Sequence, residues 1–148
     1  ILSLIPFGQA LTIKTGVVLS SSAVILSVTE KALAESAQFY DKEGLKEWNN
    51  NNFFAAIKNY TKAIEIEPNN SLLYGKRGNS YYQYGDFYAA ISDYNKSLNL
   101  NPNDKRIFLF RGMSKQKVGD INGACSDFKM ASAMGYEFAV KVIEIYCK

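Results

Sequence analysis

The side chains that most often carry out chemistry are scarce in this chain of 148 residues. Histidine is absent, which removes the commonest general base, the usual metal ligand and the imidazole of any catalytic triad. Two cysteines remain, Cys125 and Cys147, but they are too far apart for a C-x-x-C pair, and nothing marks either thiol as activated. The phosphate-binding, dinucleotide-binding and nucleophile-elbow motifs are also missing. We therefore predict no catalytic residue, no metal site and no cofactor, with an Asp, Glu, Lys or Tyr site assembled in three dimensions as the alternative.

The net charge gives only weak information about a partner. The 17 Lys and Arg residues oppose 14 Asp and Glu residues, and the formal charge of +3 is too small to argue for nucleic acid or an acidic membrane. Basic residues are densest between Lys105 and Lys117, but their spacing scatters them around a helix, as expected of a solvated face. We therefore predict a protein or peptide partner and no nucleic acid.

The elements that would position a binding surface repeat every 34 residues. Gly44, Gly78 and Gly112 keep this spacing. Further sets of small or aromatic residues keep it as well: Tyr40, Tyr74 and Phe108; Ala56, Ala90 and Ala124; Tyr60, Tyr94 and Phe128; and Ala63, Ser97 and Ala131. A fixed period of this length indicates stacked supersecondary units rather than one globular core. The units run over residues 37–70, 71–104 and 105–138.

Each unit divides into two helices with a turn between them. In the second unit we expect helices at Leu72–Tyr84 and Phe87–Asn99. The turns are Asn49–Asn52 in the first unit, Gly85-Asp86 in the second and Gly119-Asp120 in the third. Glycine at the eighth position and alanine at the twentieth allow the two helices to approach closely. Neither helix buries its apolar face alone, so each unit needs its neighbours.

This pattern of small residues and aromatic residues, with proline near the ends of the first two units, resembles the tetratricopeptide repeat. The resemblance covers residues 37–138 and implies an all-α fold, a right-handed α-α superhelix of three helix-turn-helix repeats. It also implies a C-terminal capping helix at residues 139–148 that covers the apolar face of the last repeat. Glu47 and Lys115 depart from the family, which usually has an aromatic residue at the eleventh position.

The resemblance implies a concave groove that the first helix of each unit lines. Carrying the groove positions over residue by residue gives an apolar and aromatic floor with basic residues at its C-terminal end. The predicted partner-binding residues are Leu45, Trp48, Leu72, Asn79, Tyr82, Arg106, Leu109, Met113 and Lys117. Such a groove suits an extended or helical segment with bulky apolar anchors and some negative charge. The alternative is that Trp48 packs against its own turn and that binding or self-association uses another face.

One subclass of the family binds the acidic C-terminal tails of chaperones through a clamp of Lys, Asn and Arg side chains. The corresponding positions in this sequence hold Asp41, Leu45, Lys76, Arg106 and Phe110. Only Arg106 has the chemistry that the clamp requires. The sequence therefore disfavours a chaperone tail as the partner.

The first 34 residues differ in composition from the rest. Up to Thr29 the only charge is Lys14, and an apolar run of 12 residues, Val17–Val28, follows it. With Ala32-Leu33-Ala34 behind this run, the pattern is typical of a secretory signal peptide cleaved after Ala34. An uncleaved membrane anchor is the alternative, although the run spans only about 18 Å as a helix. We expect residues 1–34 to make the protein exported or membrane-anchored, with membrane contact only if they are retained.

The segments around Cys125 and Cys147 resemble the closing portion of some bacterial exported tetratricopeptide repeat proteins. The resemblance implies a disulfide between them, which would stabilise the terminal repeat by roughly 3 kcal/mol in the chain-entropy model. Both the disulfide and the signal peptide need an oxidising location. The alternative is two buried thiols in a reducing compartment.

These observations predict a short all-α repeat protein, exported or membrane-tethered, that binds a segment of another polypeptide. One alternative is a membrane-anchored assembly factor for an envelope or photosynthetic complex. Another is a purely structural or self-associating repeat segment. The sequence does not specify the oligomeric state.

Overall fold

Helices account for nearly all of the described chain. The computed structural model describes residues 11–12, 18–19 and 21–147. Two short strands, β1 (Leu11–Thr12) and β2 (Val18–Leu19), pair in antiparallel fashion before the first helix. The helices are α1 (Ser21–Asn49), α2 (Phe53–Ile66), α3 (Ser71–Tyr84), α4 (Phe87–Leu100), α5 (Lys105–Lys117), α6 (Ile121–Ala133) and α7 (Glu137–Tyr146). The predicted all-α fold is confirmed, apart from these two strands.

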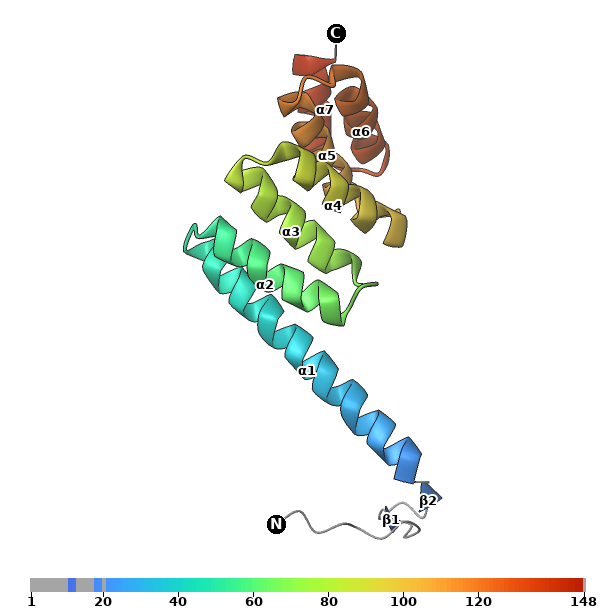
Figure 1. Ribbon diagram of the computed structural model, residues 1–148. Coiled ribbons are helices and arrows are strands. Elements are labelled where there is room, and N and C mark those ends of the chain that lie inside the picture. Colours follow the sequence, from blue (N-terminus) through green and yellow to red (C-terminus); the bar gives the residue numbers. More distant parts are fainter. Residues whose placement is uncertain (1–10, 13–17, 20, 148) are drawn as a thin grey trace.

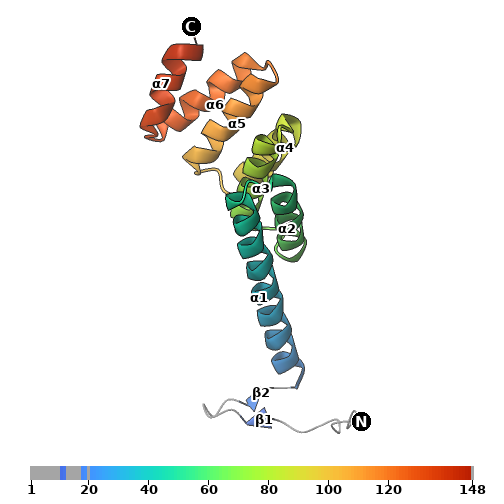
Figure 2. The ribbon, with the colours of Figure 1, turned by 90° about the vertical axis from the view of Figure 1, so that its left-hand side faces the viewer.

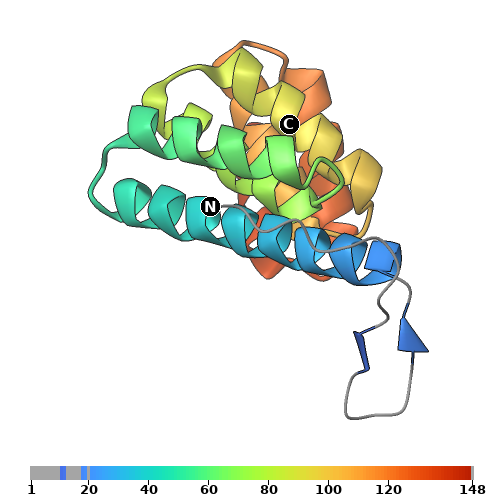
Figure 3. The ribbon, with the colours of Figure 1, turned by 60° about the horizontal axis from the view of Figure 1, so that its bottom comes forward.

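The helices follow one another along an elongated stack. Each of them contacts the next helix in the chain, and Figures 1 and 2 show the succession from α1 to α7. The pairs α1–α2, α3–α4 and α5–α6 fall within the three units expected from the sequence, and α7 adds a final layer next to α6. With 29 residues, α1 is much longer than the 14-residue α2 and extends beyond it (Figure 3).

Close approach of the two helices in each pair depends on glycine. A Cβ atom added to Gly44 would lie 2.7 Å from the ring of Tyr60, and one added to Gly112 would lie 2.5 Å from the ring of Phe128. Both rings are almost completely buried, so they cannot move aside without disturbing the core. The second pair repeats the arrangement, as the 34-residue spacing predicts.

A left-handed residue makes each turn within a pair. Asn51 has a φ of 59°, Gly85 a φ of 95° and Gly119 a φ of 85°. Asparagine tolerates this conformation best after glycine, so the asparagine run of the first unit forms the expected turn. A polar residue then caps the second helix: the Asp86 side chain, for example, accepts a hydrogen bond from the backbone N–H of Ala89.

Two buried ion pairs keep the same repeat, and the sequence analysis missed them. The Arg77 guanidinium donates from Nε and Nη2 to both carboxylate oxygens of Asp93, at 2.7 and 2.8 Å, and from Nη1 to Thr61 at 3.0 Å. One side chain thus joins α2, α3 and α4. Arg111 and Asp127 repeat the bidentate pair one unit later, at 2.9 and 2.6 Å. These pairs link neighbouring units as well as the two helices of one unit.

The C-terminal end of the stack is covered and cross-linked. Ala139 and Val142 of α7 are buried against the core of the last pair. The predicted disulfide is present: it joins Cys125 of α6 to Cys147, which directly follows α7. The capping helix is therefore held both by packing and by a covalent bond.

The predicted leader or anchor at residues 1–34 lies partly outside the described residues. From Ser21 onward, this segment is the beginning of α1, which continues without a break past Ala34 into the first unit. Within the described part of the chain, no helix combines the length and apolar character needed to cross a membrane. Export or anchoring through this segment stays a prediction.

Candidate functional site

Two adjacent hollows lie on the face that α1, α3 and α5 form. The first has a volume of about 140 Å³ and is lined by Leu45, Trp48, Tyr60, Lys76 and Asn79. The second has a volume of about 180 Å³ and is lined by Leu72, Gly75, Lys76, Asn79, Ser97, Asp104, Arg106, Ile107 and Phe110. Lys76 and Asn79 border both hollows, which we together call the groove. The groove lies on the helices that were predicted to line a concave binding surface.

Each hollow has an exposed leucine in its wall. Leu45 is 47% exposed in the first hollow, and Leu72 is 55% exposed in the second. Ile107 and Phe110 complete the apolar part of the second hollow, and neither was predicted as a groove residue. Both leucines can therefore lose apolar surface to a partner without any rearrangement of the core.

The charge at the centre of the groove is already paired. Lys76 Nζ lies 2.6 and 2.7 Å from the two carboxylate oxygens of Asp41. Both side chains remain about one third exposed, so the pair borders on solvent. Because Asp41 compensates the lysine, Lys76 contributes little net positive charge to the groove.

Asn79 presents a hydrogen-bond donor to the groove. Its Oδ1 accepts a hydrogen bond of 2.7 Å from the hydroxyl of Tyr94. Burial raises the pKa of the Tyr94 hydroxyl far above its usual range, which keeps this group protonated as a donor. With its oxygen engaged, Asn79 has its amide N–H groups left to donate, and these make no hydrogen bond among the described residues. A backbone carbonyl of an extended segment would satisfy them.

The two predicted aromatic anchors are partly occupied by their own turns. Trp48 packs edge-on against Phe53, with ring centroids 6.3 Å apart, and Tyr82 packs in the same way on Phe87 at 5.4 Å. Trp48 still lines the first hollow, but Tyr82 lines neither hollow. The internal packing considered for Trp48 in the sequence analysis therefore occurs alongside its place in the groove.

The prediction that Leu109 lines the groove is wrong. Leu109 is only 3% exposed and packs with Ala139 and Val142 of α7. The capping helix takes the place that the first helix of a following unit would have, and it covers the side of α5 on which Leu109 lies. Met113 packs partly buried against the same cluster and is not part of either hollow.

The two predicted basic residues are separated. Arg106 lines the second hollow and donates to Asp104 from Nε and Nη2, both at 3.2 Å. Burial works to raise the pKa of Asp104, but the hydrogen bonds from Arg106 and its charge outweigh burial and lower it. Lys117 lies at a different hollow, beside the turn between α3 and α4. Of the two, only Arg106 can therefore orient a partner in the groove.

The comparison with protein families agrees with the helix pairs. Models described as tetratricopeptide repeat match residues 30–70 and 71–104. The chain belongs to the tetratricopeptide repeat family. Tetratricopeptide repeat (TPR) proteins are non-enzymatic interaction scaffolds, so this chain is not an enzyme. The second match has the bounds of the second unit expected from the sequence.

Solved TPR domains have the same fold. The first TPR of Spaghetti (RPAP3), bound to the HSP90 peptide SRMEEVD, is 22% identical with a TM-score of 0.74, covering 77% of this chain and 92% of that one. The second TPR domain of human RPAP3, in complex with the HSP70 peptide SGPTIEEVD, is 23% identical with a TM-score of 0.72, covering 80% and 98%. The Arabidopsis OM64 TPR domain is 21% identical, also at 0.72, covering 76% and 93%. A search of curated proteins found no match.

Proposed function

We propose that the groove binds a segment of another polypeptide through two apolar side chains, one in each hollow. The observation that carries this proposal is the pair of adjacent hollows, each with an exposed leucine in its wall, that share Asn79. Asn79 would donate to a backbone carbonyl between the two anchors, which favours an extended segment. Peptide binding by the similar TPR domains supports the same kind of partner.

The charges of the groove argue against an acidic C-terminal tail as the partner. The peptides bound by the two RPAP3 domains end in EEVD. In this chain Asp41 neutralises Lys76 at 2.6 Å, and a carboxylate at this point would meet another carboxylate. Arg106 remains the one basic contact of the second hollow that is mostly exposed. The partner segment is therefore mainly apolar, with negative charge confined to the end near Arg106.

The protein acts in an oxidising compartment, either exported or tethered to a membrane by residues 1–34. The disulfide between Cys125 and Cys147 supports such a location, because structural disulfides persist outside reducing compartments. A tethered form would suit the assembly of an envelope or photosynthetic complex. The mass of the protein made in its native cell distinguishes the two forms, since cleavage after Ala34 removes the segment.

Substitution of the exposed leucines tests the groove more cleanly than substitution of Trp48. Changing Trp48 also removes its packing on Phe53, whereas Leu45→Lys combined with Leu72→Lys alters side chains that are about half exposed. The matched control is Ile145→Lys on α7, because Ile145 is 64% exposed and lies outside the groove. We expect crosslinking in the native cell, followed by mass spectrometry, to lose the partner with the double variant and to keep it with the control.

Equal capture of the same proteins by both variants would reject the groove as the binding site. Size-exclusion chromatography at two protein concentrations addresses self-association. If the wild type elutes earlier at high concentration and the double variant does not, the occupant of the groove is a second copy of this chain.

A further inference from the structure

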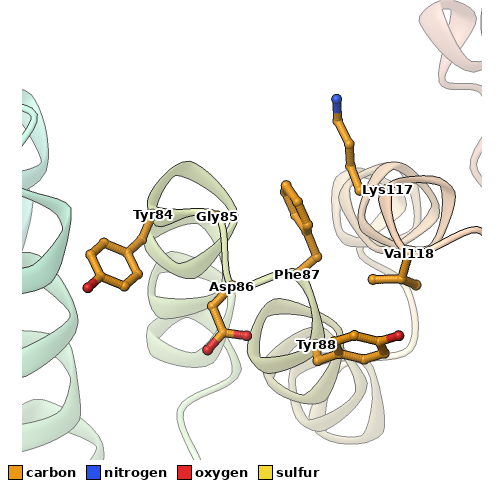
Figure 4. A pocket seen from close by; sticks show the side chains of 7 residues that line it. All are labelled: Tyr84, Gly85, Asp86, Phe87, Tyr88, Lys117 and Val118. Atoms are coloured by element: carbon orange, nitrogen blue, oxygen red, sulfur yellow. The ribbon is translucent and has the colours of Figure 1, made fainter.

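A separate hollow lies at the edge where the turns of the helix pairs gather. It has a volume of about 590 Å³ and lies beside the turn between α3 and α4 and the end of α5. Its main lining residues are Gly85, Asp86, Phe87, Tyr88, Lys117 and Val118 (Figure 4). We call it the turn notch. It shares no residue with the groove.

The preceding junction of the stack shows what the turn notch lacks. Between the first and second units, Phe54 of α2 and Tyr84 of α3 form a ring pair with centroids 6.0 Å apart. The residues 34 positions later are Tyr88 and Val118. Valine is too short to reach the ring as Tyr84 does, and Tyr88 makes no ring pair among the described residues. Tyr88 is accordingly 74% exposed, against 52% for Phe54.

The walls of the turn notch are already in place. Phe87 is held by its edge-on contact with Tyr82, at 5.4 Å between ring centroids. Gly85 fixes the turn in a left-handed conformation with a φ of 95°. In Figure 4 the Phe87 and Lys117 side chains extend in the same direction, and Tyr88 lies below Val118. A guest ring would enter a site whose surroundings are held by secondary structure.

The charges beside the turn notch are unequal in availability. Lys117 is exposed and forms no ion pair among the described residues. Asp86 points away from Lys117 in Figure 4, and its Oδ1 accepts a hydrogen bond from the backbone N–H of Ala89 at 3.0 Å. The free cation therefore favours a carboxylate close to the bound ring.

We propose that the turn notch binds an aromatic side chain of a partner protein whose neighbouring residue carries a carboxylate. The ring takes the place next to Tyr88 and Val118 that the Tyr84 ring holds next to Phe54 in the preceding junction. The carboxylate lies at Lys117. This surface is independent of the groove, so a partner could engage either one alone.

N-acetyl-tyrosine carries both features and serves as the probe. We expect a titration of the isotope-labelled full chain, followed by NMR, to shift the backbone amide signals of Gly85, Phe87, Tyr88 and Val118. N-acetyl-alanine lacks the ring and should bind up to roughly tenfold more weakly, as expected for loss of an aromatic contact. N-acetyl-tyrosinamide lacks the carboxylate and should bind about two- to fivefold more weakly.

The variant Val118→Tyr supplies the missing ring and should weaken N-acetyl-tyrosine binding by up to roughly tenfold. Val140→Tyr is the matched control, because Val140 is an exposed valine on α7, and it should leave binding unchanged. If Val118→Tyr does not fold by circular dichroism, Tyr88→Ala at an exposed position gives the same test. Unchanged affinity in the notch variant, or shifts that cluster at Leu45 and Asn79 instead, would overturn the proposal.

Discussion

The first and third repeats have the same glycine–aromatic core but are held together differently. In the third repeat Arg111 and Lys115 both contact the carboxylate of Asp127, whose side chain is 4% exposed. The same positions of the first repeat hold Glu43 and Asn59 in place of Arg111 and Asp127. Glu43 pairs only with an exposed lysine one turn along α1. The apolar pattern thus defines the fold in every repeat, whereas buried charges reinforce only some of them.

The largest expected difference between the two repeats comes from the buried carboxylate. Asp127→Ala leaves two cations without their partner and should lower the free energy of unfolding by about 3–5 kcal/mol. Asn59→Ala at the matching position should change it by less than about 0.5 kcal/mol. Urea denaturation of both variants measures the difference, and equal losses would show that the ion pairs do not set the repeats apart.

The disulfide is the second feature found in the third repeat alone. Cys125→Ser combined with Cys147→Ser opens a loop with a sequence separation of 22 and should lower the free energy of unfolding by about 3 kcal/mol. Because Ala139 and Val142 pack on the third repeat, hydrogen exchange should rise first in α7. Exchange that rises equally in α1 would contradict a local role for the disulfide.

High pH should weaken the first repeat more than the third. Burial, with the charge of Asp41 adding to it, raises the pKa of Tyr60 from 10.0 to about 12, and Phe128 holds the same position in the third repeat. The unfolded chain therefore loses this proton at lower pH than the folded one, so the contribution of Tyr60 is present below pH 10 and is lost as the pH rises through 12.

Tyr60→Phe should reduce this alkaline loss, as measured by denaturation at several pH values between 9 and 12 (about one unit either side of the transition). The loss that remains should come from Tyr94, whose pKa burial raises further. An unchanged pH profile in the Tyr60 variant would show that the tyrosine hydroxyl is not the cause.

The smallest effects should be alike in the two repeats, because both use a capped second helix. The Asn52 side chain accepts a hydrogen bond from the Ala55 N–H, and the Asp120 side chain accepts one from the Gly123 N–H. Asn52→Ala and Asp120→Ala should each cost about 1 kcal/mol by thermal denaturation. A much larger loss in one repeat would mean that its cap also supports the stack.

Most of the fold could be predicted because its determinants are spaced along the sequence. Gly44 and Tyr60 report the helix contact through their 34-residue repetition alone. The same spacing relates Arg77 to Arg111 and Asp93 to Asp127, so the ion pairs could have been found by searching charged residues as well. What hid them is that a single charged residue in a helix looks like part of a solvated face.

The groove was harder to predict, because groove positions taken from the family assume that another unit follows. Leu109 fails this assumption, since α7 buries it. Trp48 and Tyr82 fail it in part, since the rings that pack on them come from the residues after their turns. Leu45 and Leu72 lie in the middle of the stack and line the hollows as expected.

The unbroken course of α1 has a mechanical consequence. A helix of 29 residues is a rod of about 44 Å, and a rod does not swivel as a flexible linker does. Any body joined at Ser21 would rotate together with the repeats, and its distance from the first turn would stay constant. The binding surfaces would therefore be offered at a set height and bearing rather than swept through a volume.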